Sequence, residues 1–170
     1  DWDAVGSNDK VGAVEISAER MWDVMRGPVG WEEERDRQLK LDGKAVFGQD
    51  KQVSLVKVKM RVLEAEERES PIEVDPEAKG PRRLEVTVLS AQHLPKMDTF
   101  GKIDPFCKVS FGAEEYETSV KKNTYNADFD EKFVFAVEDV ASQPKGPLRI
   151  TVMDWDAVGS NDKVGAVEIS

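Results

Sequence analysis

The first seventeen residues of the chain, DWDAVGSNDKVGAVEIS, return without a single change as residues 154–170. The second copy starts 153 residues after the first (154 − 1 = 153). Identity over such a length predicts a tandem array with a unit of about 153 residues, of which this chain holds one period cut inside a unit. Each copy is therefore expected to occupy the same place in two successive units.

The boundary between units is predicted where the chain is least globular. Residues 64–83, EAEERESPIEVDPEAKGPRR, are rich in proline and acidic residues and show neither a helical nor an alternating pattern, which is typical of a linker. We therefore divide the chain into residues 1–64, the C-terminal part of one unit, residues 65–81, the linker, and residues 82–170, the N-terminal part of the next unit.

Most of the remaining sequence alternates between apolar and polar residues. In the segment 84–91, Leu84, Val86 and Val88 share one face. Runs with this period of two, separated by turn residues, predict an antiparallel β-sandwich. The expected strands are 10–17, 53–63, 84–91, 105–111, 115–120, 131–137, 148–155 and 163–170.

One short helix is expected at residues 17–25. Ser17 can cap its start, and Gly27-Pro28 ends it. Its apolar stripe consists of Met21, Trp22, Val24 and Met25.

Charge and cysteine content narrow the classes of function. The net charge of −10 argues against nucleic acid as a partner. The single cysteine, Cys107, cannot form an internal disulfide, which favours a reducing compartment and a cytoplasmic location. The single histidine, His93, is expected at the surface and not as a metal ligand. Because no nucleophile lies beside a base and no glycine-rich phosphate loop is present, we expect a binding protein and not an enzyme.

Three aspartates, Asp154, Asp156 and Asp162, fall within nine residues. Carboxylates this close repel one another unless a cation lies among them, and hard oxygen ligands suit calcium. An EF-hand is excluded because Val158 and Gly165 stand at its fifth and twelfth positions and strands, not helices, flank the loop. A single loop supplies too few oxygens, so a second acidic loop is needed.

The segment LPKMDTFGKIDPFCKV, residues 94–109, provides a second acidic loop, with Asp98 and Asp104 six positions apart. Three segments resemble, in this order, the first six strands of a C2 domain, the calcium- and phospholipid-binding β-sandwich: RRLEVTVLSAQHLPKMDTFGKIDPFCKVSF, KKNTYNADFDEKFVFAV and LRITVMDWDAVGSNDKVGAVEIS. Residues 17–65 resemble the part of that family after its sixth strand: a short helix, a strand near 34–41, a turn at Asp42-Gly43 and a long last strand. The resemblance implies an all-β, eight-stranded antiparallel sandwich with the type II strand order, in which the first and last strands are neighbours.

The same resemblance implies a site. Its five-aspartate pattern, which would bind Ca²⁺, falls on Asp98, Asp104, Asp154, Asp156 and Asp162. The backbone carbonyls of Met97 and Trp155 stand where the family adds ligands. Phe100 and Val158 are expected at the loop tips, in contact with the membrane. The implied function is calcium-dependent binding to anionic phospholipid membranes, at a peripheral membrane or cytoskeleton-associated location.

Two alternatives remain open. The chain could be a structural or scaffold repeat that contacts proteins or neighbouring repeats, with calcium stabilising the array and no lipid role. The two parts of the chain could also combine as one permuted sandwich or exchange between chains. In a permuted sandwich one copy of the repeated segment is surplus, and we expect residues 154–170 to keep the site because they continue directly from the preceding strand.

Overall fold

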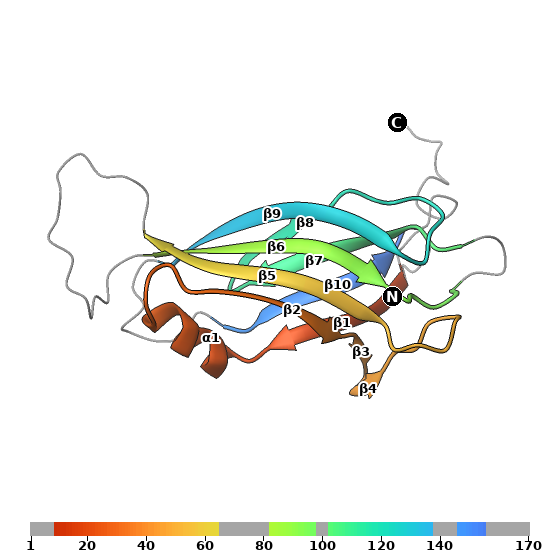
Figure 1. Ribbon diagram of the computed structural model, residues 1–170, viewed down its shortest axis with the longest axis horizontal. Coiled ribbons are helices and arrows are strands. Elements are labelled where there is room, and N and C mark those ends of the chain that lie inside the picture. Colours follow the sequence, from red (N-terminus) through yellow and green to blue (C-terminus); the bar gives the residue numbers. More distant parts are fainter. Residues whose placement is uncertain (1–8, 65–81, 98–101, 138–145, 156–170) are drawn as a thin grey trace, which may run out of the picture.

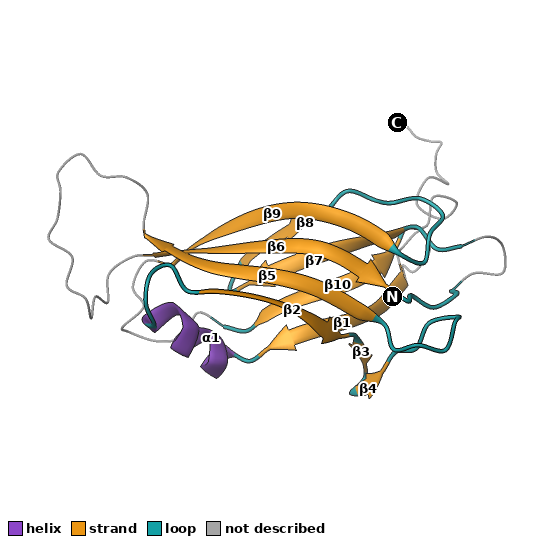
Figure 2. Cartoon of the chain, in the orientation of Figure 1, coloured by secondary structure: helices purple, strands orange, loops and turns teal. Residues whose placement is uncertain are grey.

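Two antiparallel β-sheets face each other along the length of the molecule, and one short helix lies at one end (Figures 1 and 2). The computed structural model describes residues 9–64, 82–97, 102–137 and 146–155. The helix is α1 (Ala18–Arg26), and the strands are β1 (Asp9–Ile16), β2 (Glu32–Gln38), β3 (Lys40–Leu41), β4 (Lys44–Ala45), β5 (Leu55–Glu64), β6 (Arg82–Gln92), β7 (Pro105–Phe111), β8 (Glu114–Glu117), β9 (Ala127–Val137) and β10 (Leu148–Asp154).

The strand order is that of the predicted sandwich. One sheet has the order β4-β3-β1-β10-β7-β8 and the other the order β2-β5-β6-β9. Eight strands form the body of the sandwich, and the two-residue strands β3 and β4 form a small hairpin at the edge of the first sheet. β5 and β6 pair along their whole length, from Leu55 opposite Gln92 to Glu64 opposite Arg82. The predicted all-β antiparallel fold is confirmed, with the first and last strands of the unit side by side.

The N-terminal copy of the repeated segment supplies a central strand. β1, from residues 9–16, pairs with β10 from Asp9 opposite Asp154 to Ile16 opposite Leu148. Residues 9–64 and 82–155 thus contribute strands to the same two sheets. Residues 156–170 and the predicted linker 65–81 lie outside the described residues, so the expectation that the C-terminal copy keeps the site remains a prediction.

The alternating pattern places the expected faces in the core. Leu84, Val86 and Val88 of β6 are fully buried. On the opposite sheet, Cys107 and its neighbours on the same face of β7 are buried as well. Burial raises the pKa of the Cys107 thiol, with a smaller contribution from the negative charge of Glu131. The thiol therefore packs as a small apolar group and stays protonated.

Helix α1 is attached to the sandwich through both its cap and its apolar side. The Ser17 hydroxyl accepts a hydrogen bond from the backbone N–H of Arg20 at 3.1 Å, as the sequence predicts. Met21, Val24 and Met25 are buried. At the other end, the buried Arg82 of β6 donates a hydrogen bond to the Met25 carbonyl at 2.8 Å and another to the Gly27 carbonyl. A cation at the C-terminal end of a helix is favourable because the last carbonyls there lack intrahelical partners.

The segment 34–41, predicted as one strand, is divided between the two sheets. β2 ends at Gln38 in the four-stranded sheet, and Lys40 pairs with Ala13 of β1 in the six-stranded sheet. Leu39, between them, is fully buried and bonds through its backbone N–H to the Ser54 carbonyl. Burial of this one side chain explains why the chain changes sheets here. The predicted turn is confirmed, since Asp42 and Gly43 both have positive φ (53° and 82°), as tight hairpin turns require.

Two other strand bounds differ from the prediction by three or more residues. β8 ends at Glu117 and not at residue 120. The Thr118 hydroxyl accepts a hydrogen bond from the backbone N–H of Cys107 at 2.9 Å, so this N–H does not bond to a backbone carbonyl of a longer β8. β9 begins at Ala127, four residues earlier than expected. Its first residues pair with the end of β6 across a register shift between Val88 and Ser90, and such shifts are difficult to predict from alternation.

Candidate functional site

The acidic loops predicted to hold the metal emerge at the end of the sandwich opposite α1 (Figure 1). β10 ends there at Asp154, and β1 starts there at Asp9. The described parts of the loop after β6, residues 93–97 and 102–104, reach the same end, which we call the acidic pole. Neighbouring antiparallel strands bring these ends together because one strand finishes where its partner begins.

Asp104 and Asp154 are in direct contact at the acidic pole. The Asp154 carboxylate, 2% exposed, accepts a hydrogen bond from the backbone N–H of Asp104 at 2.9 Å. In return, the Asp104 carbonyl accepts one from the backbone N–H of Trp155 at 2.9 Å. Two aspartates that are fifty positions apart in the sequence are therefore held side by side by reciprocal backbone contacts. A separation of these two loops would have ruled out a shared metal site.

A third segment, residues 121–126, closes the pole from another side. The backbone N–H of Asn123 donates to Oδ1 of Asp104 at 2.6 Å, and the Asn123 side chain accepts from the backbone N–H of Lys102 at 3.0 Å. Asn123 has a φ of 55°, a conformation that asparagine tolerates better than most residues. Asp104 is thus oriented by a backbone donor, and among the described residues its second oxygen accepts no hydrogen bond.

Lys122 also reaches the pole, which sequence reasoning missed. Its ammonium lies 3.7 Å from the centre of the Trp155 ring, the residue after Asp154. The sequence predicts a solvated strand end at Lys121-Lys122. The pattern Lys-Lys before an acidic strand gives no indication of this contact, because it depends on how segment 121–126 packs against the start of β7.

Of the other predicted site residues, two are described and five are not. Met97 has a side chain that is 37% exposed at the pole, and Trp155 comes directly after β10. Asp98, Phe100, Asp156, Val158 and Asp162 lie outside the described residues. Within the described part of the chain, no three metal-binding side chains form a cluster, and only two of the five predicted aspartates fall in that part.

The backbone of the N-terminal copy brings a further aspartate position to the pole. Asp9 stands opposite Asp154 in the pairing of β1 with β10. Asp9 and Asp162 occupy the same place in the two identical copies (162 − 9 = 153). The structure thus places opposite Asp154 the residue of the N-terminal copy that corresponds to Asp162 in sequence.

The loop between β4 and β5 lies at the same pole and presents an exposed aromatic residue. Phe47 is 57% exposed, the highest value among the described large apolar side chains. Its backbone bridges to Val53. Gly48 packs so closely on the carbonyl of His93 that a Cβ there would lie 2.3 Å from that oxygen. Sequence reasoning missed Phe47 because a lone aromatic residue beside a turn gives no sign of its exposure.

A side-chain hydrogen bond anchors this loop to the start of the first acidic loop. Nδ1 of His93 lies 2.7 Å from Oδ2 of Asp50. The hydrogen bond with His93, together with a smaller contribution from the backbone N–H of Gln52, lowers the pKa of Asp50 below its ordinary value. The histidine predicted at the surface is therefore half-buried and serves as a loop anchor.

We expect the Asp50 contact to contribute stability only while Asp50 is ionised. A lowered pKa in the folded state means that the contribution is present above the ordinary aspartate pKa and is lost as the pH falls through the folded-state value. The variant Asp50→Asn should therefore be less stable than the wild type at pH 7 and equal to it in acid. Urea unfolding at both pH values would test this, with the exposed Asp36→Asn as control. A difference that persisted in acid would contradict the prediction.

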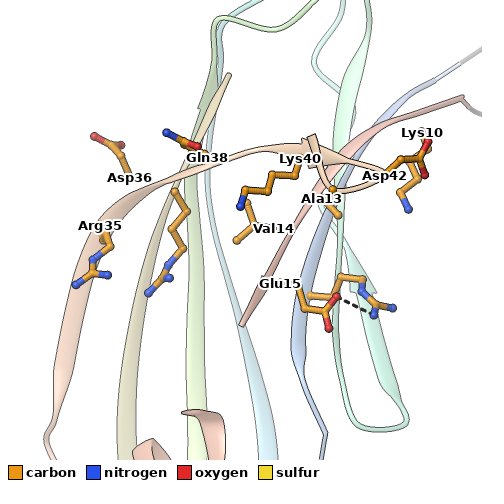
Figure 3. Close-up of a pocket in the computed structure, with 12 residues that line it drawn as sticks. Lys10, Ala13, Val14, Glu15, Arg35, Asp36, Gln38, Lys40 and Asp42 are labelled. Atoms are coloured by element: carbon orange, nitrogen blue, oxygen red, sulfur yellow. Dashed lines mark hydrogen bonds and ion pairs between the residues drawn. The ribbon is translucent and has the colours of Figure 1, made fainter. Parts of the chain in front are cut away.

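A pocket of about 740 Å³ lies between β1 and β2 (Figure 3). Five cationic and three acidic side chains line it. Arg149 pairs with Glu15 at 3.1 Å, and Arg35 and Arg37 both pair with Glu33. The three acidic side chains that line the pocket, together with Glu33, nearly balance its five cations, so the pocket does not point to an anionic ligand.

The acidic pole therefore has the donor chemistry of a hard-cation site. The carboxylates of Asp104 and Asp154 are oriented by backbone N–H groups, and oxygen ligands from flexible loops suit calcium. The residues fit such an ion. No helix in the described part of the chain is both long and apolar enough to cross a bilayer.

A family model of the C2 domain matches residues 82–170, which are 89 of the 170 residues. The chain belongs to the C2 domain family. The resemblance found in the sequence is thereby confirmed, whereas the tandem array remains a prediction. C2 domains in general are calcium- and phospholipid-binding modules and not enzymes.

Three relatives illustrate the match to other C2 proteins. Human RasGAP-activating-like protein 1 is 40% identical over 89 residues, 52% of this chain and 11% of that protein. Synaptotagmin-1 of Caenorhabditis elegans is 41% identical over 88 residues, 49% of this chain and 20% of that protein. Synaptotagmin-3 of Arabidopsis thaliana is 38% identical over 85 residues, 48% of this chain and 15% of that protein. The chain thus spans between 11% and 20% of the length of these relatives.

Proposed function

We propose that this C2 domain binds calcium at its acidic pole and thereby docks reversibly on anionic phospholipid membranes. Asp104 and Asp154 would be ligands, together with Asp98, Asp156 and either Asp162 or Asp9, and the carbonyls of Met97 and Trp155 would complete the set. The observation that carries the proposal is the direct contact of Asp104 with Asp154, because it joins two acidic loops at one end of a C2 sandwich.

The proposed role of calcium is to reverse the charge of the pole. A cluster of carboxylates repels an anionic membrane surface, and a chain with a net charge of −10 has no excess of cations to offset this. Bound divalent ions neutralise the carboxylates and attract lipid phosphates, which can complete the coordination shell. Lys122, stacked on Trp155, would add a cation to the same surface once the carboxylates are neutralised.

Apolar side chains would strengthen the docked state. Phe100 and Val158 are proposed to enter the membrane interface, and Phe47 would join them from a third loop. Burial of one such side chain contributes about 1.5–3 kcal/mol. Docking by a few of them remains reversible, as a calcium-controlled contact requires.

Cosedimentation with vesicles tests the proposal. Phosphatidylserine-containing vesicles should pellet the protein in calcium and leave it in solution with a chelator. Vesicles of phosphatidylcholine alone are the control for charge. A rise in melting temperature with calcium but no pelleting would replace the membrane proposal with the scaffold alternative. The absence of both effects would contradict calcium binding itself.

Replacement of Phe47 by alanine should weaken vesicle binding without changing calcium binding. The loss of one buried aromatic contact corresponds to about a tenfold or larger drop in the apparent vesicle affinity. The matched control is Val29→Ala, because Val29 is 42% exposed and comes after α1 at the opposite end of the sandwich. Equal vesicle affinity for wild type and Phe47→Ala would exclude this loop from the docking surface.

Calcium should also raise the stability of the domain. A ligand that binds only the folded state stabilises it by about 2.7 kcal/mol when its free concentration is 100 times its Kd. Thermal unfolding with increasing calcium should therefore give a melting temperature that rises with concentration, while magnesium at the same concentration gives a smaller shift. An unchanged melting temperature would argue against a site in the folded domain.

A further inference from the structure

The buried contacts of β1 in the six-stranded sheet are made by side chains that both copies of the repeated segment carry. β1 lies between β10 and β3, and its inward residues Val11, Val14 and Ile16 are 1%, 5% and 5% exposed. The C-terminal copy carries the same side chains at Val164, Val167 and Ile169. The chain therefore contains two identical segments. In the part of the chain that the structure describes, there is one strand position between β10 and β3 for them to fill.

A glycine near the start of this strand makes the site selective. A Cβ on Gly12 would lie 2.8 Å from Cγ of Leu39 and 3.0 Å from the carbonyl oxygen of Lys40. Both distances are shorter than ordinary contacts, and Leu39 is fully buried, so a larger residue forces the strand or its neighbour to move. Gly165 stands at the matching place in the C-terminal copy.

The polar contacts of β1 are also available to the second copy. Arg149 of β10 pairs with Glu15 at 3.1 Å, and Glu168 is the matching residue. The pairing of Asp9 with Asp154 would become a pairing of Asp162 with Asp154. The seven residues 155–161 would then connect two antiparallel neighbours, a length close to that of common short connections.

We propose that the position beside β10 is a strand-exchange site, in which residues 162–169 of the same chain replace residues 9–16 in an identical register. The packing is the same for both occupants, so the exchange changes only the connections. With residues 9–16 in place, the strand continues directly into α1. With residues 162–169 in place, it follows β10 through the connection 155–161.

The occupant is assigned to the same chain because of effective concentration. A segment joined to its site by a short loop is present at an effective concentration in the millimolar range. A second copy of the chain at micromolar concentration competes poorly with it. The exchange decides whether Asp9 or Asp162 stands opposite Asp154, and it does not depend on the proposed calcium binding.

Disulfide trapping distinguishes the two occupants in the full chain. Ala13 faces Thr151 in the register of β1 with β10, and Ala166 matches Ala13 in the second copy. The pair Ala13→Cys with Thr151→Cys should crosslink the described arrangement. The pair Ala166→Cys with Thr151→Cys should also crosslink, within one chain, as judged by mass after oxidation. The native Cys107 is buried and does not compete.

Two results would overturn the proposal. The first is efficient crosslinking of Ala13→Cys but none of Ala166→Cys, which would make residues 9–16 the sole occupant. The second is crosslinking of Ala166→Cys only between two chains, which would assign the site to a partner molecule.

Paired glycine variants provide an independent readout. Gly12→Val and Gly165→Val alone should each lower the melting temperature only slightly, because the unchanged copy fills the site. The double variant should lower it by several degrees more than the two single effects combined. If residues 9–16 alone fill the site, Gly12→Val should have the full effect, Gly165→Val none, and the double variant no additional one.

Discussion

Replacing Asp154 by asparagine is expected to weaken calcium binding at least about tenfold, which corresponds to about 1.4 kcal/mol. Asp154 is buried at the meeting point of two acidic loops, where its oxygen accepts the backbone N–H of Asp104. Asparagine keeps an oxygen that can accept this hydrogen bond but removes the negative charge. The substitution should therefore reduce the calcium affinity more than it disturbs the local backbone. Isothermal titration with calcium would measure it.

The matched control is Asp128→Asn, an exposed aspartate on β9, which should leave the titration unchanged. Thermal unfolding of both variants in a chelator would show that the fold is retained. Asp156→Asn, in the part of the acidic loop outside the described residues, should behave like Asp154→Asn. Normal calcium affinity in both Asp154→Asn and Asp156→Asn would refute the assignment of the site.

The largest loss of stability is expected from Phe135→Ala, at about 3–5 kcal/mol. Phe135 of β9 is fully buried and lies edge to face with Phe111 of β7, with ring centres 5.7 Å apart. The two rings come from opposite sheets, so their contact joins the halves of the sandwich. The truncation leaves a cavity that the two sheets can close only by moving together, and close-packed sheets resist such a movement. Urea unfolding would measure the change.

Val134→Ala is the control for this prediction. Val134 is next to Phe135 on the same strand but is 39% exposed, so its truncation should change the free energy of unfolding by no more than about 0.5 kcal/mol. Similar effects of the two variants would indicate that the contact between the sheets contributes little.

Much of the fold followed from local patterns in the sequence. The alternation in segments such as 84–91 and 105–111 identified buried faces, because side chains of a strand alternate between its two sides. Ser17 and the stripe of α1 identified the helix, and Asp42-Gly43 identified a turn, because each depends on residues close together in the chain. The spacing of the aspartates pointed to the acidic pole, and the structure places Asp104 against Asp154 there.

Other features depend on contacts between distant segments. Leu39 leads the chain from one sheet to the other, and Lys122 stacks on Trp155, because of packing that no local pattern records. The clearest case is the repeated segment itself. Its two copies have identical local preferences, so sequence alone cannot choose between them, and only the tertiary structure shows residues 9–16 as β1 beside β10. That choice is a property of the whole folded chain, and the strand-exchange experiments address it directly.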